Sequence, residues 1–395
     1  MPDYLSYKEA FKGVSKPFSF LDLELFEENI QALLKRAGSK TLRVASKSIR
    51  CASVLQRILV SSQRIQGILG YSPKEALFLS QKGFDDIVIG YPTAQPPLIR
   101  PLLEEILRGK RITFMVDLFE HAALLNALAK EAGVQAGVCL DVDMSYALFG
   151  LHLGAWRSSL TRLESVVSLA QRLHELPFVR VDGLMGYEAQ VAGVPDRLKG
   201  RPLKNLLVGL LKALSKPDVA RRRKEAVEVL AHEGIQLGFV NAGGTGSLES
   251  SAAEGCVSEV TAGSGFYGPH LFDVYRGFCP KPALGFALEV SRHPKPGVYT
   301  LSGGGFVASG PPGWEKLPSP YLPEGVRLSP AEGVGEVQTP VFYQGKERFS
   351  LGDPIFFRHA KAGELLEHFN TVHLLSKGKI VGEVPTYRGE GQAFL

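Results

Sequence analysis

The chain has 395 residues, with 45 lysines and arginines against 40 aspartates and glutamates, so its formal net charge is +5. Hydrophobic residues make up 45% of the chain and charged residues 22%, which excludes a disordered protein. A small excess of positive charge over this length also lacks the concentration typical of nucleic-acid binding. We therefore expect two or three globular domains, although one α/β barrel alone uses about 250 residues.

The cysteines are far apart and form no C-x-x-C pair: Cys51, Cys139, Cys256 and Cys279. This spacing excludes a disulfide framework and a thiolate zinc knuckle, and it fits a reducing compartment. The first residues show no secretory signal, and no uncharged apolar stretch reaches the roughly 18 residues of a membrane span. The prediction is a soluble cytoplasmic protein.

Up to about residue 265, short apolar runs alternate with longer segments of helical spacing. The expected strands are Phe18–Leu21, Thr41–Ala45, Gly67–Leu69, Asp86–Ile89, Ile112–Val116, Ala136–Val142, Val179–Met185, Leu237–Asn241 and Val257–Ala262. The expected helices include Leu23–Arg36, Ala52–Leu59, Glu120–Ala132, Leu160–His174 and Glu225–His232. This alternation predicts βαβ units and a parallel sheet. The strands come close to the eight of a (β/α)₈ barrel, but the spacing leaves an open doubly wound sheet as the alternative.

The pattern changes near Pro280, where proline and glycine become frequent and helical spacing nearly disappears. Short strands joined by turns are expected here, among them Phe286–Val290, Val298–Leu301, Gly335–Phe342 and Ile380–Val384. The predicted division is therefore an α/β domain over residues 1–280 and a β domain over residues 281–395. In the segment 193–224, the basic run Arg221–Lys224 is interpreted as a solvated helix face.

Lys47 follows an expected strand directly, in the sequence Val-Ala-Ser-Lys. In a barrel the carboxyl ends of the strands form the mouth of the active site, so Lys47 would lie there. A lysine that is removed from water loses its proton easily and can form a Schiff base with a carbonyl group. The alternative is an ordinary surface lysine at the end of a strand.

Two glycine-containing loops follow the last two expected strands of the α/β part. Gly243, Gly244, Thr245 and Gly246 form the first loop, and the second is Thr261–Tyr267. Such loops expose backbone N–H groups, and the first runs into an expected helix start, so together they predict a phosphate site. The alternative is a pair of plain tight turns.

Two further groups of residues are candidates for a site. Tyr187 and Gln190 follow a strand, and either lines a pocket or lies at its rim. His359 and His368 are nine residues apart, which on one helix places them on opposite sides. The pattern therefore favours histidines that do not jointly hold a metal.

The order of these motifs resembles the fold-type III pyridoxal-phosphate enzymes. A lysine after an early strand, then GLMGYEAQ, a GGTGS turn and TAGSGFYG before a β domain, is most similar to the D-threonine aldolase and D-serine dehydratase branch and its amino acid deaminase/aldolase relatives. The resemblance covers nearly the whole chain. It implies an alanine racemase-like (β/α)₈ barrel with a C-terminal β domain, a homodimer, and a small amino-acid substrate without nucleic acid or membrane.

The resemblance also implies which residues hold the cofactor, pyridoxal 5'-phosphate. Lys47 corresponds to the lysine that carries it, and Tyr187 to a tyrosine near its ring. The implied phosphate-binding residues are Gly244, Thr245, Gly246, Ser264, Gly265 and Tyr267. These positions agree with the anion site and the imine-forming lysine expected from the residues alone.

This sequence departs from the family pattern at the positions of an arginine, a histidine and a metal motif. Leu148 and Gln190 stand where the family has the arginine and the histidine. The His-x-Cys or His-x-Asp metal motif corresponds to His359-Ala-Lys361, or in a rival alignment to His368-Phe-Asn370. A divalent metal is therefore doubtful, and His359 or His368 is the ligand that the sequence offers for one. We hypothesise that the Lys361 ammonium replaces the metal.

The resulting prediction is a pyridoxal-phosphate lyase that acts on a β-hydroxy amino acid of D configuration. It implies an external aldimine formed by displacing Lys47, then Cα–Cβ cleavage by an aldolase or loss of the hydroxyl by a dehydratase. His359, Lys361 or Gln190 would contact the β-hydroxyl. The alternatives are an amino-acid racemase, a non-catalytic pyridoxal-phosphate-binding protein, or a barrel for another phosphorylated metabolite with a structural Lys47.

Overall fold

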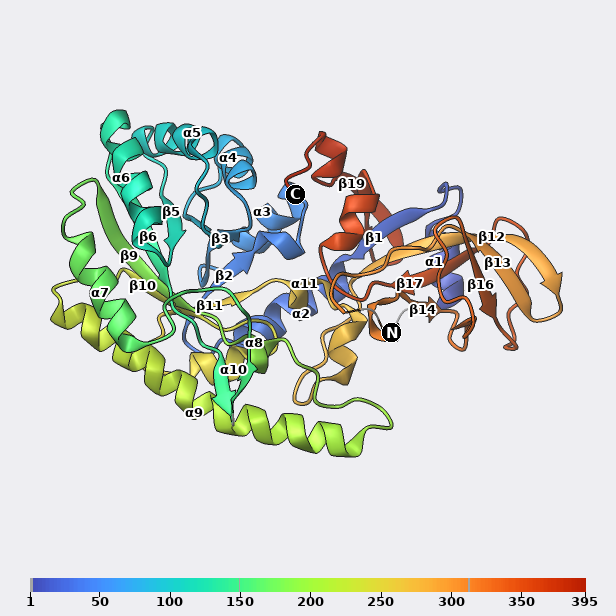
Figure 1. The fold of residues 1–395 in the computed structure, drawn as a ribbon. Coiled ribbons are helices and arrows are strands. Elements are labelled where there is room, and N and C mark those ends of the chain that lie inside the picture. The colour runs from blue at the N-terminus through green and yellow to red at the C-terminus, as the bar shows by residue number, and fades with distance from the viewer. Residues whose placement is uncertain (1–2, 149, 312) are drawn as a thin grey trace. The chain divides into compact units, whose positions relative to one another are not determined.

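The structure, a computed structural model, describes residues 3–148, 150–311 and 313–395 (Figure 1). Its contacts divide the chain into two compact units that are not two consecutive stretches. One unit contains Leu33–Lys47, Arg57–Gly263 and Phe394–Leu395, and we call it the barrel unit. The other contains Met1–Ala32, Ser48–Gln56 and Ser264–Ala393, and we call it the sheet unit.

The barrel unit is built around a closed parallel β-barrel. Its strands are β2 (Thr41–Ala45), β3 (Ile65–Gly70), β4 (Ile87–Ile89), β5 (Ile112–Val116), β6 (Ala136–Asp141), β9 (Val179–Gly186), β10 (Phe239–Ala242) and β11 (Glu259–Ala262). The barrel closes because β11 pairs in parallel with β2, with Val260 opposite Leu42. The (β/α)₈ barrel is therefore confirmed, and the open doubly wound sheet is excluded.

Side chains fill the interior of the barrel. Val88, Met115, Cys139 and Met185 form a buried cluster from four different strands. Arg43, which is 3% exposed, adds a buried ion pair of 2.6 Å with Glu259. A barrel with a packed interior leaves its chemistry to the loops at the carboxyl ends of the strands.

The helices of the barrel unit lie outside its strands (Figure 1). They are α4 (Pro73–Gln81), α5 (Pro96–Leu107), α6 (Phe119–Ala132), α7 (Leu163–Leu173), α8 (Ala189–Ala192), α9 (Pro202–His232) and α10 (Leu248–Ala252). Helices α2 (Leu23–Arg36) and α3 (Ala52–Val60) each have residues in both units. A short hairpin of β7 (Tyr146–Leu148) and β8 (Leu151–Leu153) follows β6. Among the described residues, no helix is long and apolar enough to cross a membrane.

Helix α9 is far longer than the sequence pattern indicates. It has 31 residues and continues through Pro217, whereas only its last turns were expected as a helix. The interpretation of Arg221–Lys224 as a solvated face is wrong for half of the run. Arg223 is completely buried, and Arg222 donates hydrogen bonds to the carbonyl oxygens of Ser145 and Asp143. These arginines point inward because the loops beside α9 present carbonyls and carboxylates to them.

The sheet unit consists mainly of a nine-stranded sheet in the described chain. Its strands are β1 (Phe18–Asp22), β12 (Leu284–Lys295), β13 (Val298–Ser302), β14 (Ser319–Leu322), β15 (Arg327–Leu328), β16 (Gln338–Phe342), β17 (Pro354–Arg358), β18 (Thr371–Ser376) and β19 (Lys379–Pro385). The short helices α1 (Tyr4–Ala10) and α11 (Ser264–Tyr267) also belong to this unit. The expected strand-rich C-terminal part is present.

Strand β1 corrects the expectation that the first strand belongs to the parallel α/β sheet. It pairs antiparallel with β12 and parallel with β18, inside the sheet unit. Phe11, Phe18, Phe20 and Phe356 pack around it with ring centroids 4.7–6.5 Å apart. Its continuous burial gives no alternation that would reveal which sheet it joins.

Candidate active site

Lys47 lies at the carboxyl end of β2, in the turn Ser46–Ser48. Its side chain is exposed, so the protein alone does not provide the desolvation that the sequence argument expected. The Nζ atom lies 3.5 Å from the hydroxyl oxygen of Tyr91, which follows the end of β4. The phenol therefore limits the positions that the ammonium group of Lys47 can take.

A cation lies over two tyrosine rings at the same edge of the barrel. The Arg157 guanidinium carbon is 5.8 Å from the ring centroid of Tyr91 and 5.8 Å from that of Tyr187. At this distance the positive charge is attracted to both ring faces. Lys47, Tyr91, Arg157 and Tyr187 thus form a connected group at the carboxyl ends of β2, β4 and β9.

Tyr187 closes one side of this group and contacts the glycine turn after β10. A Cβ atom on Gly244 would lie 3.0 Å from the Tyr187 ring, so any larger residue would push the ring away from the backbone. Burial, and secondarily the nearby Glu188 carboxylate, raises the pKa of Tyr187 to about 12. Its phenol is therefore protonated at neutral pH and can donate a hydrogen bond.

The glycine turn depends on backbone conformations that other residues rarely adopt. Gly243 has a φ of +79°, which lies in the left-handed region. The Gly244 amide donates to the Ser247 hydroxyl at 3.1 Å, and the Gly246 amide has no partner among the described residues. The following helix α10 has only five residues, so the Gly246 amide rather than a helix dipole is the donor that the turn offers to an anion.

A buried carboxylate fixes this turn from below. Glu188, which is 2% exposed, accepts hydrogen bonds of 2.6 Å from the hydroxyls of Ser247 and Ser251. Arg223 of α9 donates to the same carboxylate at 2.8 Å and is also paired with Glu254. These contacts connect the C-terminal half of α9 to the loop after β9 and to the glycine turn after β10.

Gln190 has a different environment from the one predicted for it. Its amide nitrogen donates to the Met144 carbonyl oxygen at 2.6 Å and to the Ser215 hydroxyl at 2.8 Å. Its amide oxygen is buried without a hydrogen-bond partner among the described residues. Gln190 therefore connects the loop after β6 with α9, and its predicted contact with substrate stays a prediction.

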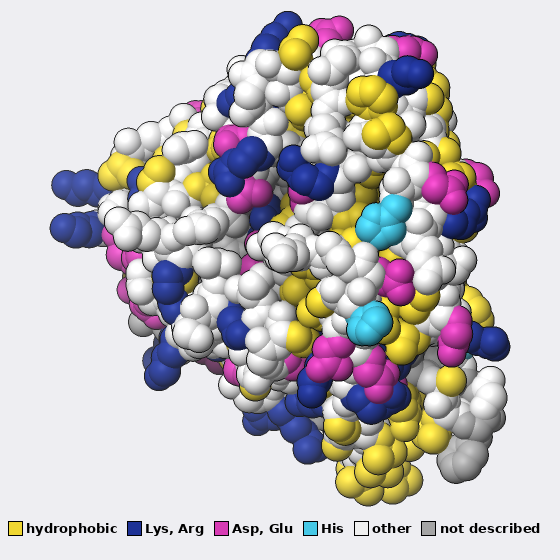
Figure 2. Space-filling model, turned by 90° about the vertical axis from the view of Figure 1, so that its left-hand side faces the viewer, with side chains coloured by type: hydrophobic (Ala, Val, Ile, Leu, Met, Phe, Trp, Pro, Cys, Tyr) yellow, Lys and Arg dark blue, Asp and Glu magenta, His cyan; other side chains and the backbone are white. Residues whose placement is uncertain are grey.

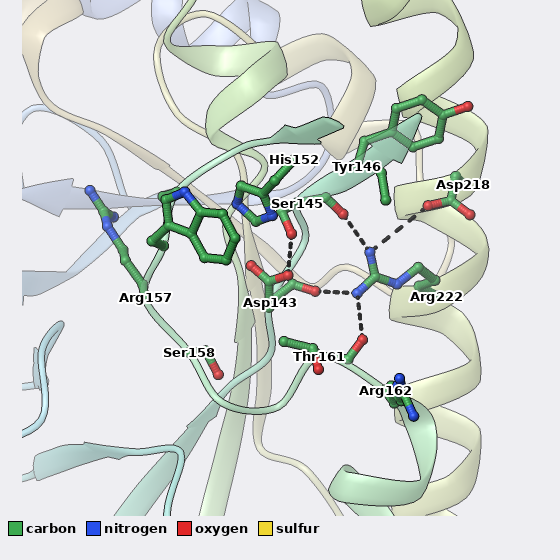
Figure 3. Close-up of a pocket in the computed structure, with 13 residues that line it drawn as sticks. Asp143, Ser145, Tyr146, His152, Arg157, Ser158, Thr161, Arg162, Asp218 and Arg222 are labelled. Atoms are coloured by element: carbon green, nitrogen blue, oxygen red, sulfur yellow. Dashed lines mark hydrogen bonds and ion pairs between the residues drawn. The ribbon is translucent and has the colours of Figure 1, made fainter. Parts of the chain in front are cut away.

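A cavity of about 450 Å³ lies beside this edge of the barrel (Figure 3). Arg222 lies on one side of the cavity, and Arg157 lies on the opposite side with its guanidinium directed away from the cavity. Nearby, at the end of β6, burial and the neighbouring Asp117 raise the pKa of Asp141 to about 7, although Arg157 opposes this shift. Asp141 is thus able to hold or release a proton near neutral pH.

The residues of the second predicted phosphate loop from Ser264 onward lie in the sheet unit. The hydroxyl oxygen of Ser264 is 3.2 Å from that of Ser48, and Gly265 is buried. Tyr267 is completely buried and donates its hydroxyl to the Ile49 carbonyl oxygen at 2.9 Å. The Tyr267 hydroxyl is therefore used within the sheet unit, and the predicted phosphate contacts of Ser264 and Gly265 stay predictions.

The residues of the predicted metal motif also lie in the sheet unit. The Nδ1 atom of His359 lies 3.1 Å from the Leu284 carbonyl oxygen, while its buried Nε2 atom has no described partner. Burial lowers the pKa of His359 to about 3, so the ring is neutral. Lys361 donates to the Ser309 carbonyl oxygen at 3.1 Å. His368 is exposed, with its ring 4.9 Å from that of Phe306.

Comparison with known proteins identifies the barrel. A model of the family "Alanine racemase, N-terminal domain" matches residues 21–270. The chain belongs to this family. A D-threonine aldolase of Arthrobacter sp. is 28% identical over 298 residues, or 74% of this chain and 72% of that enzyme. A 3-hydroxy-D-aspartate aldolase of Paracoccus denitrificans is 27% identical over 253 residues, or 64% of this chain and 60% of that enzyme.

Solved structures show the same fold over nearly the whole chain. The D-threonine aldolase from Filomicrobium marinum has a TM-score of 0.80 at 19% identity and covers 95% of this chain and 96% of its own. The D-threo-3-hydroxyaspartate dehydratase from Delftia sp. HT23 has a TM-score of 0.74 at 19% identity, covering 98% and 99%. The family match and the curated relatives confirm the resemblance to fold-type III pyridoxal-phosphate enzymes, and the solved structures show the same barrel with a strand-rich second part.

The donor set near His359 does not fit a divalent metal ion. No group of three or more histidine, cysteine, aspartate or glutamate side chains is placed to hold a metal in the described part of the chain. The position two residues after His359 is a lysine, whose ammonium is a cation without a free electron pair. We therefore derive no chemistry through a metal for this member of the family.

Sequence reasoning missed four residues of the site: Tyr91, Arg157, Glu188 and Arg223. Tyr91 was within reach, because it follows an expected strand at the same edge as Lys47. Arg157 had no such signal, because it lies in a loop nine positions after Leu148, where the sequence predicted the loss of a cation. Glu188 and Arg223 are paired only by the tertiary structure.

Replacing Arg223 with leucine should destabilise the protein strongly, because the carboxylates of Glu188 and Glu254 would remain buried without their partner. We expect a loss of about 3–5 kcal/mol in the free energy of unfolding. The matched control is Arg221→Leu on the same helix, whose exposed ion pairs with Asp218 and Glu225 contribute little. Urea unfolding of the three proteins measures the difference, and equal losses in both variants would contradict the buried network.

Replacing Asp141 with asparagine should stabilise the protein above pH 7. The wild-type carboxyl keeps its proton up to about pH 7 in the folded state but loses it near pH 4 in the unfolded state. The contribution of Asp141 to the free energy of unfolding therefore falls as pH rises between these two values. The gain is at most about 4 kcal/mol and disappears below pH 4. Asp85→Asn is the control of opposite sign, because Arg111 lowers the pKa of Asp85 against the effect of burial. Melting temperatures across pH 4–9 test both.

The protein as purified should carry no stoichiometric divalent metal, and dialysis against a chelator should leave its melting temperature unchanged. The reason is the ammonium group at position 361 beside a single buried imidazole. Elemental analysis by mass spectrometry measures the metal content. One metal ion per chain that is lost in His359→Ala would show that this interpretation is wrong.

Proposed function

We propose that the protein is a pyridoxal-phosphate-dependent lyase that acts on β-hydroxy amino acids of D configuration. The observation that carries this proposal is the group of Lys47, Tyr91, Arg157 and Tyr187 at the carboxyl edge of a barrel of this family. The names of the relatives support the substrate class, because threonine and 3-hydroxyaspartate share a hydroxyl group on Cβ.

The residues of the barrel unit fit the cofactor. Lys47 offers an accessible amine, and the glycine turn offers backbone donors for the phosphate beside Tyr187. When bound, pyridoxal phosphate supplies an electrophilic carbon and a ring that withdraws electrons from Cα of the amino acid. Ser264 and Gly265 remain predicted phosphate contacts.

Each residue of the group has a task that follows from its chemistry. Lys47 offers its Nζ atom as the nucleophile that attacks a carbonyl carbon. The Tyr91 hydroxyl, 3.5 Å away, holds the amine in place. Arg157 offers a positive charge to the carboxylate of the substrate or the phenolate of the cofactor. Tyr187 donates a hydrogen bond, and Glu188 keeps the glycine turn in shape.

An aldolase needs a base that accepts the proton of the β-hydroxyl, whereas a dehydratase expels the hydroxyl group instead. Asp141, with a pKa of about 7, is the residue of the barrel unit that we assign to this proton. His359, Lys361 and Gln190 remain the predictions from sequence. A racemase would instead need a second acid or base on the opposite face of the ring.

We propose further that the protein acts in the cytoplasm as a homodimer. The cysteines Cys51, Cys139, Cys256 and Cys279 are all free thiols in the structure. Unpaired thiols, two of them buried, are typical of a reducing compartment and support this location.

Lys47→Arg should abolish the absorbance of bound cofactor near the visible edge, because a guanidinium keeps the charge but forms no imine. Loss of D-hydroxy amino acid turnover should accompany it, by a factor of at least about 1,000. Lys130→Ala, an exposed lysine on α6, is the control and should keep both.

The same preparation identifies the reaction. We expect aldehyde plus a shortened amino acid from D-threonine or D-3-hydroxyaspartate if Cα–Cβ is cleaved, and keto acid plus ammonia if the hydroxyl is lost. Absence of the absorbance band in the wild-type protein would contradict the proposal that it binds pyridoxal phosphate. A band with no product other than the L enantiomer would favour the racemase.

A further inference from the structure

The Arg157 cation is placed by the backbone that carries it. Its side chain is exposed, and its guanidinium makes no hydrogen bond or ion pair with any described residue. The contacts with the rings of Tyr91 and Tyr187 attract the charge, but at an exposed site such contacts are weak. The position of the cation therefore depends on residues 143–161, which leave the barrel after β6 and include the hairpin of β7 and β8. We call these residues the Arg157 segment.

Packing alone does not hold the Arg157 segment in place. The cavity of about 450 Å³ is lined by Ser145 and Trp156 of the segment and by Arg222 of α9 (Figure 3). Trp156 is 84% exposed, and its ring stacks on that of His152 with the centroids 3.7 Å apart. A segment beside an open cavity lacks the van der Waals contacts that fix a buried loop. Hydrogen bonds must therefore supply much of the restraint.

Arg222 connects both ends of the Arg157 segment to α9. Its guanidinium donates to the carbonyl oxygens of Ser145 at 2.7 Å, Asp143 at 2.5 Å and Thr161 at 3.3 Å (Figure 3). A guanidinium holds its N–H donors in a fixed planar fork, so one side chain can bind carbonyls from both ends. Figure 2 shows lysine and arginine side chains projecting from many parts of the surface, whereas the side chain of Arg222 is only 21% exposed.

A second anchor binds the segment to the barrel. The Ser159 amide donates to the Asp117 carboxylate at 2.8 Å, and the Ser159 hydroxyl donates to the Asp117 carbonyl oxygen at 2.5 Å. Asp117 directly follows β5, so this contact fixes the segment to the rigid edge of the barrel. Arg222 and Asp117 thus hold the residues around Arg157 from two sides, the helix and the barrel.

We propose that Arg222 is a positioning residue for the reaction: by holding the Arg157 segment against α9, it keeps the Arg157 cation over Tyr91 and Tyr187. The inference rests on the proposed function, in which Arg157 offers its charge to the substrate or the cofactor. A displacement of about 1 Å in such a group can lower a rate by about 100-fold, so a residue that touches neither substrate nor cofactor can still control the reaction.

Turnover of a D-hydroxy amino acid tests the role of Arg222 in the reaction. Arg222→Met removes the donors and keeps an apolar stem, and we expect it to lower kcat/KM by about 10- to 100-fold. Arg222→Lys can donate to some of the same carbonyls and should recover part of this loss. The control is Arg221→Met, which breaks surface ion pairs with Asp218 and Glu225 and should leave kcat/KM unchanged.

A double variant separates positioning from a general structural role. If Arg222 acts through Arg157, then Arg157→Met and Arg157→Met/Arg222→Met should have the same kcat/KM, with the same split between kcat and KM. Losses that multiply in the double variant would overturn the inference, because Arg222 would then act independently of Arg157. Circular dichroism shows whether each variant is folded, and Arg222→Lys replaces Arg222→Met in this comparison if the methionine variant does not fold.

Tryptophan fluorescence measures the segment without cofactor or activity. The chain has two tryptophans, so Trp314→Phe leaves Trp156, next to Arg157, as the single emitter. In this background Arg222→Met should lower the fluorescence anisotropy of Trp156, and Arg221→Met should not. An unchanged anisotropy in the folded Arg222→Met protein would overturn the inference. A wild type without turnover or cofactor absorbance would instead contradict the proposed function, and the anisotropy would still decide whether Arg222 holds the segment.

Discussion

The buried guanidinium of Arg223 is the interaction on which the candidate site depends. A charge that is completely removed from water is costly unless carboxylates and carbonyls surround it. Arg223 meets this requirement with Glu188, Glu254 and the Gly186 carbonyl oxygen. Glu188 in turn holds the hydroxyls of Ser247 and Ser251, so one ionic cluster fixes helix α9 and the glycine turn. Because the turn is already fixed in its shape, it would lose little conformational entropy on binding an anion.

The carboxyl edge of the barrel gathers polar groups that come from distant parts of the sequence. Lys47 is exposed, so the residues of the protein do not desolvate it. Its Nζ atom lies beside Tyr91, whose ring faces the Arg157 guanidinium, and a cation is therefore present although Leu148 occupies the position of the family arginine. What a site needs is a cation at the right position in space, and an arginine on a loop elsewhere in the chain can provide it.

Much of the fold could be predicted from the sequence, because buried strands and amphipathic helices leave periodic patterns. The strands Thr41–Ala45 and Ile112–Val116 and the helix Leu23–Arg36 have the bounds that the pattern indicates. The hydrophobic pattern did not predict the structure where a strand is buried on both faces, or where charged residues lie in the interior. Strand β1 is buried throughout and gives no sign of its partners. In the basic run on α9, Arg223 is buried against two carboxylates and Arg222 is half-buried against backbone carbonyl oxygens.

The sequence by itself determined the family, because the order of its motifs lies along one chain, and it placed Lys47 and the glycine turn at the ends of expected strands. Its spacing left the barrel and an open sheet as alternatives, because closure of a barrel depends on the pairing of distant strands. Only the tertiary structure decided how the site is assembled. It placed Tyr91 beside Lys47, Arg157 over two rings and Arg223 under the turn, and it committed the Tyr267 hydroxyl to Ile49. Contacts of this kind join residues tens to hundreds of positions apart, and their energies depend on burial and distance, which no local pattern encodes.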